Sequence, residues 1–252
     1  GEGEATREQI WVQPPGTPTV GMAYLRMFHA TGDPFYLAGA TESAEALVYG
    51  QLQSGGWTNL IDFDPNGRVA LYRNGKGKGK NNSSLDDGQT QAAIQLLVQV
   101  DAAHKFQHET VHEAAQYALR SLLAAQFPNG AFPQVWTGPL ASEPSPEHSL
   151  PASYPEYDWR TEGRIKNYWN MYTLNDNVCG YVAEALIEAE RVYDDRRCDR
   201  ALRRLGDFLL AAQMPDPQPA WAQQYNYQMK PIWARRNRVR LRSSSAVSSV
   251  PS

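Results

Sequence analysis

The feature of this sequence that most constrains its fold is a pattern that occurs three times along the chain. Each copy holds a helical segment, a short turn, a second helical segment and a loop with a glutamine, small residues and an aromatic residue. Gln51, Gln126 and Gln213 occupy matching places, 75 and 87 residues apart. Repeats of this length are typical of helical hairpins that stack side by side. The pattern therefore predicts an all-α fold of helical hairpins, which can close into an (α/α) toroid with long loops on one rim.

The spacing of apolar residues within the copies favours helices over strands. Ala92, Leu96, Val100 and Ala103 follow the i, i+4, i+8, i+11 pattern, which places side chains on one face of a helix. Pro34 can begin the second helix of the first copy, because the first turn of a helix does not use its backbone N–H groups.

The repeat also predicts where polar residues gather. The first helices of the copies run parallel, so their N-terminal ends open on one face, and the glutamine loops return to that face. Unpaired N–H groups and the helix dipole make such a face suitable for an anionic ligand. Residues 62–88 and 137–172 interrupt the repeat at this face, and Lys76, Lys78 and Lys80 alternate with glycine there. For this Gly–Lys stretch a flexible, solvated loop is favoured over a clamp for a polyanion.

Charge and composition limit the classes of partner that the protein can bind. The net charge of −3 argues against nucleic acid or an anionic membrane as the main partner, but it leaves an acidic polysaccharide open. No apolar run approaches the roughly 18 residues of a membrane-spanning helix, so we expect no membrane span. The chain opens on Gly1-Glu2-Gly3-Glu4, without a signal peptide.

The two cysteines are not expected to form a disulfide. Cys179 lies near one end of a predicted helix, and Cys198 lies near the opposite end of the next. At about 1.5 Å rise per residue, more than about 20 Å would separate them, whereas a disulfide joins Cα atoms about 6 Å apart.

Acidic residues precede the second and third copies. Asp86 and Asp87 stand before the second, and Asp176 follows Asn175 before the third. Asp86 and Asp176 each suit the N-cap of a helix. They also suit calcium, which prefers carboxylate and amide oxygens. The two roles are compatible, so both remain open, and no His/Cys set has the spacing of a zinc site.

Four sequence blocks resemble polysaccharide lyase family 10, the pectate lyases with an (α/α) toroid. The blocks are QFPNGAFPQVW from residue 126, YWNMYTLNDNV from residue 168, PAWAQQYNYQMKPIWAR from residue 219 and, more loosely, SLDDGQTQ from residue 84. With the first copy of the repeat, the resemblance runs from about residue 17 to 236 in family order.

The resemblance implies cleavage of polygalacturonate by calcium-assisted β-elimination, in which a proton leaves C5 of a uronate and the glycosidic oxygen leaves C4. By similarity, Asp86 and Asp176 would hold calcium or a bridge of calcium to the substrate, with Asp87 or Asn175 nearby. Arg235 would be the base. Substrate-binding candidates are Lys166, Arg164, Gln134, Gln223 and Asn175, with Tyr172 and Trp136 for stacking on sugar rings. The resemblance also implies a secreted or periplasmic enzyme, expected to be a monomer.

The expected domain boundaries follow from the same resemblance. Residues 1–16 would be an N-terminal extension, and residues 17–236 the lyase-like toroid. Residues 237–252 are rich in arginine and serine and depart from the family pattern, so we expect a disordered tail. A shifted reading frame or an open-reading-frame artefact would explain it, and a basic tail with a function of its own is the alternative.

Two other function classes remain. The first is a non-catalytic protein or remnant that binds a uronate polysaccharide, or a lyase for another uronate polymer. The second is a triterpene-cyclase-like toroid enzyme, because the stretch QLQSGGW from residue 51 resembles the Gln/Trp loops of those enzymes. That class needs an Asp-x-Asp-Asp cluster, and only Asp86-Asp87 is found.

Overall fold

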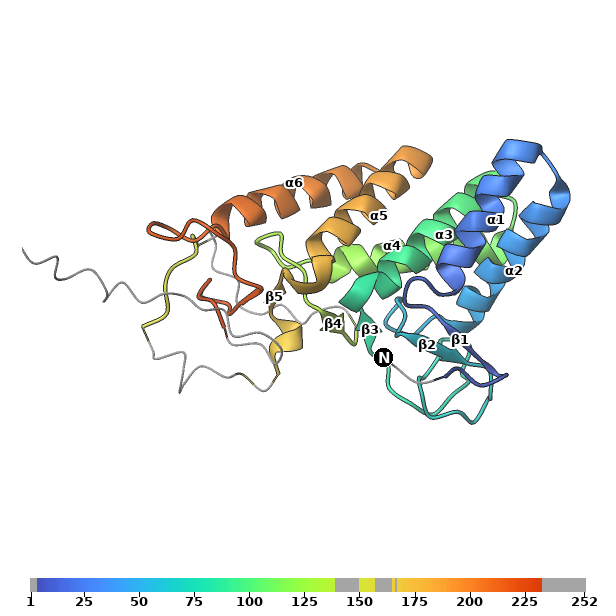
Figure 1. Cartoon of the computed structure of the whole chain (residues 1–252), viewed down its shortest axis with the longest axis horizontal. Helices are drawn as coiled ribbons and strands as arrows, with labels where there is room; N and C mark the ends of the chain where they lie inside the picture. The colour runs from blue at the N-terminus through green and yellow to red at the C-terminus, as the bar shows by residue number, and fades with distance from the viewer. Residues whose placement is uncertain (1–3, 139–149, 157–164, 166, 233–252) are drawn as a thin grey trace, which may run out of the picture.

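Six α-helices arranged as three hairpins dominate the part of the chain that the structure describes, so the predicted all-α class is confirmed. A computed structural model of the chain describes residues 4–138, 150–156, 165 and 167–232. In each hairpin the two helices pack together, and the first helices of the three hairpins pack in succession along the array (Figure 1). The helices are α1 (Thr17–Thr31), α2 (Pro34–Gly50), α3 (Gln89–Ala103), α4 (Glu109–Ala124), α5 (Val178–Tyr193) and α6 (Arg196–Ala211).

Local sequence explains where the helices begin and end. The Asp33 side chain accepts a hydrogen bond from the amide of Phe35, and Pro34 occupies the first turn of α2, as predicted. Asp195 caps α6 in the same way. Gly32 ends α1 with φ of 72°, a left-handed conformation that glycine adopts without a side-chain clash.

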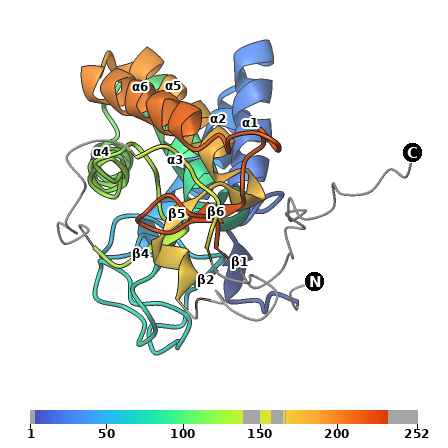
Figure 2. The same ribbon diagram turned by 90° about the vertical axis from the view of Figure 1, so that its left-hand side faces the viewer.

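Each hairpin is flanked by a pair of short antiparallel strands, which the sequence did not predict. One strand precedes the first helix, and its partner follows the glutamine loop of the same hairpin, so the repeating unit is strand, hairpin, loop and strand (Figure 2). The pairs are β1 (Gln9–Trp11) with β2 (Leu60–Asp62), β3 (Ser83–Ser84) with β4 (Val135–Trp136), and β5 (Tyr172–Thr173) with β6 (Gln224–Tyr225).

Strand β1 places part of the expected N-terminal extension inside the first unit. Ile10 pairs with Ile61, and the amide of Val12 donates to the carbonyl of Asn59. Residues 9–13 therefore contact the first unit, and the expected domain boundaries stay a prediction.

The repeated glutamines join neighbouring hairpins. The side-chain amide of Gln51 donates to the carbonyl of Ala114 on α4 at 2.9 Å, and that of Gln126 donates to Ala201 on α6 at 2.9 Å. Both glutamines are buried, whereas Gln213 at the end of the array is exposed. Sequence similarity among the three glutamines thus reflects a structural role, which two of them fulfil within the described residues.

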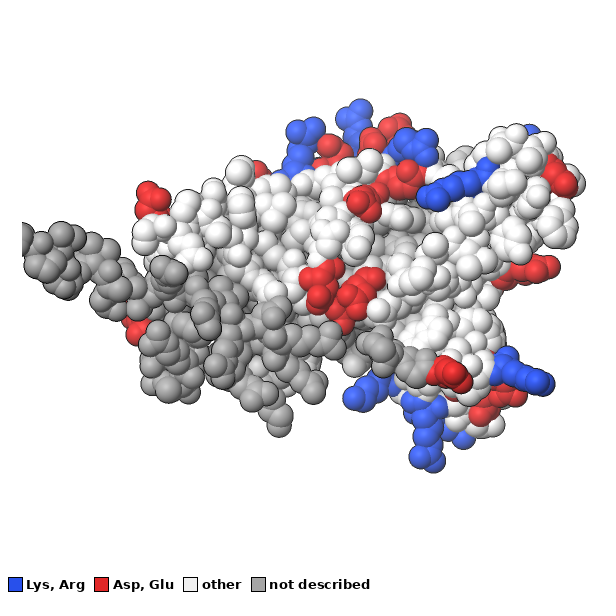
Figure 3. Space-filling view, in the orientation of Figure 1, with Lys and Arg blue, Asp and Glu red and all other residues white. Residues whose placement is uncertain are grey.

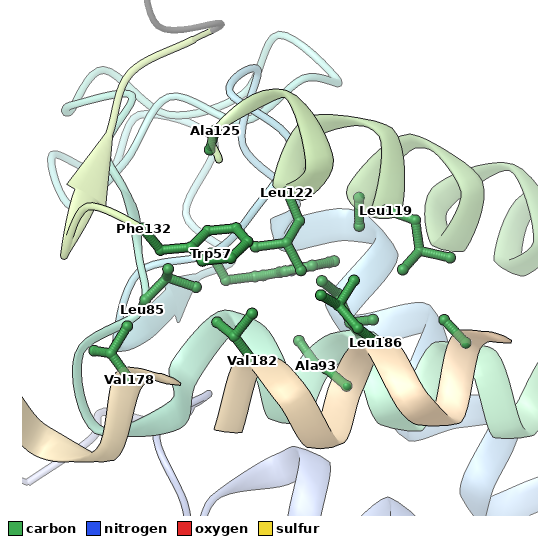
Figure 4. Close-up of a cluster of buried hydrophobic side chains, with 14 of the residues drawn as sticks. Trp57, Leu85, Ala93, Leu119, Leu122, Ala125, Phe132, Val178, Val182 and Leu186 are labelled. Atoms are coloured by element: carbon green, nitrogen blue, oxygen red, sulfur yellow. The ribbon is translucent and has the colours of Figure 1, made fainter. Parts of the chain in front are cut away.

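The aromatic residue at the end of each glutamine loop is buried where a further hairpin follows. Trp57 and Phe132 are 0% exposed, and Figure 4 shows Trp57 beneath Leu122 of α4. Trp221, the third member, is 50% exposed. Burial of this loop aromatic residue therefore accompanies the packing of a following hairpin.

Both cysteines are buried and free, which confirms that they form no disulfide. Burial raises the pKa of the Cys179 thiol to about 12 and that of Cys198 to about 11. Among the described residues, none of the helices has the length and apolar content that crossing a membrane requires.

Candidate functional site: an acidic cluster at the helix N-termini

Two equivalent turns lead into α3 and α5. Asp87 and Gly88 have φ of 46° and 75°, and Asp176 and Asn177 have φ of 52° and 56°. Asp, Asn and Gly are the residues that adopt this left-handed conformation at least cost. Neither α3 nor α5 receives a hydrogen bond from a capping side chain. The structure therefore corrects the N-cap interpretation of Asp86 and Asp176, because both precede the caps.

The turns bring three carboxylates together. Asp86, Asp87 and Asp176 each offer an oxygen atom, and these atoms all lie within 4.8 Å of one another. Figure 3 shows acidic side chains grouped where α3 and α5 begin. Residues about 90 positions apart in the chain thus share one site, because two successive repeats place the same turn side by side.

Neutral polar side chains surround the cluster. Gln13 donates to the Oδ2 atom of Asp87 at 3.0 Å, and the Asn175 amide donates to the Oδ2 atom of Asp176. The side chain of Gln134 is hydrogen-bonded to Asp86. The Oδ1 atom of Asn175 is buried and has no hydrogen-bond partner among the described residues. The site therefore combines carboxylate oxygens with a neighbouring amide oxygen that lacks a donor.

The environment of Asp86 disfavours its charged form. Burial raises the pKa of Asp86 to about 6, and the nearby Asp176 and Asp87 add to this effect. The hydrogen bond from Gln134 acts in the opposite direction. A bound cation would reverse the balance, because it would neutralise the carboxylates that now repel one another.

Gln134 and Gln223, two predicted substrate ligands, occupy equivalent places. The carbonyl of Gln134 accepts from the amide of Leu85, and the carbonyl of Gln223 accepts from that of Leu174. Gln134 is 7% exposed and contacts Asp86, so its side chain orients a carboxylate in this structure. Gln223 is half-buried beside the turn that carries Asn175.

The two rings predicted to stack on sugars belong to the core. Trp136 is 2% exposed, and its indole N–H donates to the carbonyl of Ser54. Tyr172 is 4% exposed and packs edge-on against Phe127 and Phe208. Rings buried on all sides have no free face for a sugar, so the structure corrects this prediction.

Other aromatic rings at the same end of the molecule are accessible. Trp169 is 40% exposed, and its carbonyl accepts from the amide of Gln134. Tyr181, one turn into α5, is 37% exposed, and its ring lies against Gly88. The sequence pattern did not distinguish these rings from buried ones, because burial here depends on contacts between repeats.

A groove adjoins the acidic cluster. It has a volume of about 210 Å³ and lies between α1, α3 and α5, where Met22, Gln91 and Tyr181 line it together with Gly88. Gly88 follows Asp87 directly, so the groove opens beside the carboxylates. Three further predicted site residues, Arg164, Lys166 and Arg235, lie outside the described residues.

Comparison with known proteins identifies the family. A family model described as pectic acid lyase matches residues 51–250. The match includes most of residues 237–252, which the sequence alone placed outside the domain. No curated protein matches the chain.

Solved structures share the fold. A family 10 polysaccharide lyase from Cellvibrio cellulosa has a TM-score of 0.51 and 20% identity, over 83% of this chain and 56% of that one. A mutant of a family 10 lyase from the same organism, in complex with trigalacturonic acid, has a TM-score of 0.52 and 20% identity over 83% and 57%. A cellobiose 2-epimerase from Bacillus thermoamylovorans has a TM-score of 0.55 and 13% identity over 86% and 48%.

These likenesses differ in what they establish. At identities of 20% or less, the solved structures show a shared fold alone, and this chain spans little more than half the length of the lyases. The family model is more specific, because it covers most of the sequence, including the acidic turns and the glutamine loops. The chain therefore belongs to the pectic acid lyase family.

Proposed function

We propose that this protein cleaves polygalacturonate by β-elimination, with a calcium ion held at the cluster of Asp86, Asp87 and Asp176. The observation that carries the proposal is the convergence of three carboxylates from two repeats, with oxygen atoms within 4.8 Å of one another. Membership of the pectic acid lyase family supports the reaction class, and the complex of a related lyase with trigalacturonic acid supports the substrate.

The residues of the cluster fit calcium. Calcium takes six to eight oxygen ligands from carboxylates, amide carbonyls and water. Three carboxylates supply negative charge, and the buried Oδ1 atom of Asn175 is an amide oxygen without a donor. When bound, the cation would neutralise a uronate carboxylate and so make the neighbouring C5–H more acidic.

The remaining steps of the proposed reaction depend on side chains of the protein. Gln13 and Gln134 hold Asp87 and Asp86 in place by hydrogen bonds. By the resemblance, Lys166 and Arg164 would pair with uronate carboxylates, and Arg235 would remove the proton from C5. An arginine can accept this proton only if its surroundings suppress its charge, since a guanidinium group is otherwise always protonated in proteins.

The direct test measures the unsaturated uronate product by its ultraviolet absorbance, with polygalacturonate and added calcium. We expect product in calcium and none after chelation. Arg235→Ala should abolish product while leaving polymer binding unchanged, and Arg200→Ala, on the exposed side of α6, is the matched control. Full activity of Arg235→Ala would refute the assignment of the base.

A second candidate function is binding of the polymer without cleavage. The exposed Gln213 and Trp221 favour it, because an accessible amide and an accessible indole ring can contact a sugar. Binding that needs calcium but yields no product would support this candidate against the lyase. In either case the polymer is extracellular, so we propose a secreted or periplasmic protein.

A further inference from the structure

A short segment between β2 and β3 concentrates positive charge in an otherwise acidic protein. Residues 64–80 contain five basic side chains and one acidic side chain, a net charge of +4, whereas the whole chain has a net charge of −3. The basic residues are Arg68, Arg73, Lys76, Lys78 and Lys80. The remainder of the chain is thus more acidic than its overall charge suggests, and the segment stands out electrostatically.

The segment has a defined backbone path in this structure, whereas the sequence favoured a flexible, solvated loop. Its second half folds back on its first half through backbone hydrogen bonds. The amide of Gly77 donates to Pro65 at 3.0 Å, that of Lys78 to Gly67 at 2.7 Å, and that of Gly79 to Ala70 at 3.0 Å. These bonds fix the path of the backbone that carries the lysines.

Close backbone contact explains why glycine alternates with lysine. A Cβ atom at Gly77 would lie 2.1 Å from the carbonyl oxygen of Ala70, and one at Gly79 would lie 2.4 Å from the amide nitrogen of Ala70. Gly77 also has φ of 74°, which favours glycine. Gly77 and Gly79 therefore lie against residue 70, while Lys76, Lys78 and Lys80 are exposed.

The exposed basic groups have no acidic partner within the described residues. Arg73 is engaged with Glu113 at 2.7 Å and with the side chain of Gln51. No carboxylate of the described residues forms an ion pair with Arg68, Lys78 or Lys80. Figure 3 shows basic side chains projecting from this part of the surface. Holding like charges together without counter-charges is unfavourable, and a polyanion would relieve the repulsion.

The segment lies close to the acidic cluster along the chain. Lys80 lies six positions before Asp86, a stretch of chain that spans at most about 22 Å when fully extended. Figure 3 places the basic side chains and the acidic group on one visible face. A polymer bound at the cluster could therefore extend to the lysines, whereas a short oligomer could occupy the cluster alone.

We propose that Arg68, Lys78 and Lys80 form a distal subsite that binds carboxylates of a uronate polymer several sugar units away from the acidic cluster. The subsite rests on the proposed function for its substrate class. Its contacts are electrostatic and exposed to solvent, so they weaken as salt screens them. The subsite would select long chains over short ones.

The test compares Lys78→Gln/Lys80→Gln with the wild-type chain. Affinity for polygalacturonate and for trigalacturonic acid is measured by calorimetry at low and high salt, in chelator and in calcium. We expect about tenfold weaker binding of the polymer at low salt, no difference at high salt, and unchanged binding of the trimer in every condition. Both lysines are exposed, so the variant should unfold at the wild-type temperature.

Lys105→Gln/Arg200→Gln is the matched control, because it removes two exposed positive charges elsewhere. Equal polymer affinity of Lys78→Gln/Lys80→Gln and wild type, or an equal loss in the control pair, would overturn the subsite. Binding in chelator proceeds without turnover, so the two proposals can fail separately. If polymer binding depends on the lysines but no unsaturated product forms, the proposed lyase activity is wrong and the subsite stands. If product forms but polymer binding does not depend on the lysines, the subsite is wrong and the lyase activity stands.

Discussion

Asp87 and Asp176 occupy equivalent turns in successive repeats and share a left-handed backbone, with φ of 46° and 52°. Each precedes a second left-handed residue, Gly88 or Asn177, and then the first residue of a helix. Because the helices that follow pack side by side, the two carboxylates meet. One turn, used twice, therefore builds the acidic cluster.

Replacing Asp176 should weaken calcium binding. Asp176→Asn removes one of three carboxylates whose oxygens lie within 4.8 Å, and calcium affinity rises with ligand charge. We expect at least about a tenfold loss of affinity by calorimetry, and loss of lyase product. Asp207→Asn, on the exposed surface of α6, should bind calcium as the wild type does. Equal affinities for the two variants would place the ion elsewhere.

Stability without calcium should fall as pH rises from about 4 to 6. The pKa of Asp86 is raised to about 6 in the folded protein, so between its ordinary value and 6 the folded state binds more protons than the unfolded state. The free energy of unfolding therefore decreases as the pH rises through this range, and the stabilisation from protonated Asp86 is lost above about pH 6. Urea unfolding at several pH values in chelator measures this slope.

Two comparisons test the origin of that slope. Asp86→Asn should flatten the dependence across the same window, because it removes the titrating group. Saturating calcium should reverse the sign, since the cation favours the charged form. A slope that survives Asp86→Asn would show that another group is responsible.

The repeated glutamines should differ in importance by position. Gln126→Ala removes hydrogen bonds to the carbonyls of Gly130 and Ala201 and leaves both acceptors buried, at a cost of about 2 kcal/mol. Gln213→Ala, its exposed counterpart, should cost less than about 0.5 kcal/mol. Denaturant unfolding of both variants checks the difference, and similar losses would mean that the link between hairpins does not stabilise the array.

The glycine of the second glutamine loop should tolerate no side chain. A Cβ atom at Gly130 would lie 1.9 Å from the carbonyl oxygen of Arg204 on α6, so Gly130→Ala must separate the hairpins and should cost more than about 3 kcal/mol. Gly32→Ala is the control, because Gly32 is also left-handed but has no neighbour within 4 Å. Gly32→Ala should lower the free energy of unfolding by about 1 kcal/mol, from backbone strain alone. Equal unfolding temperatures for both variants would refute the close approach.

Several features of the fold were predictable because they depend on local pattern. Helical spacing around Leu96 and the proline-led start of α2 are properties of neighbouring residues, and both were predicted correctly. The three glutamines marked the repeat, although the short strands beside the hairpins were missed. Two- or three-residue strands carry no recognisable alternation, and each pairs with a partner about 50 residues away.

The candidate site also has features that the sequence predicted and features that only the structure revealed. The sequence by itself determined which residues are acidic, and the order of its blocks pointed to a uronate lyase. The resemblance assigned Asp86, Asp87 and Asp176 to one calcium site. Only the tertiary structure showed that their oxygen atoms lie within 4.8 Å, that Gln13 binds Asp87, and that Trp136 and Tyr172 are buried. Composition and spacing are properties of the chain, whereas proximity and burial arise only when separate repeats pack together.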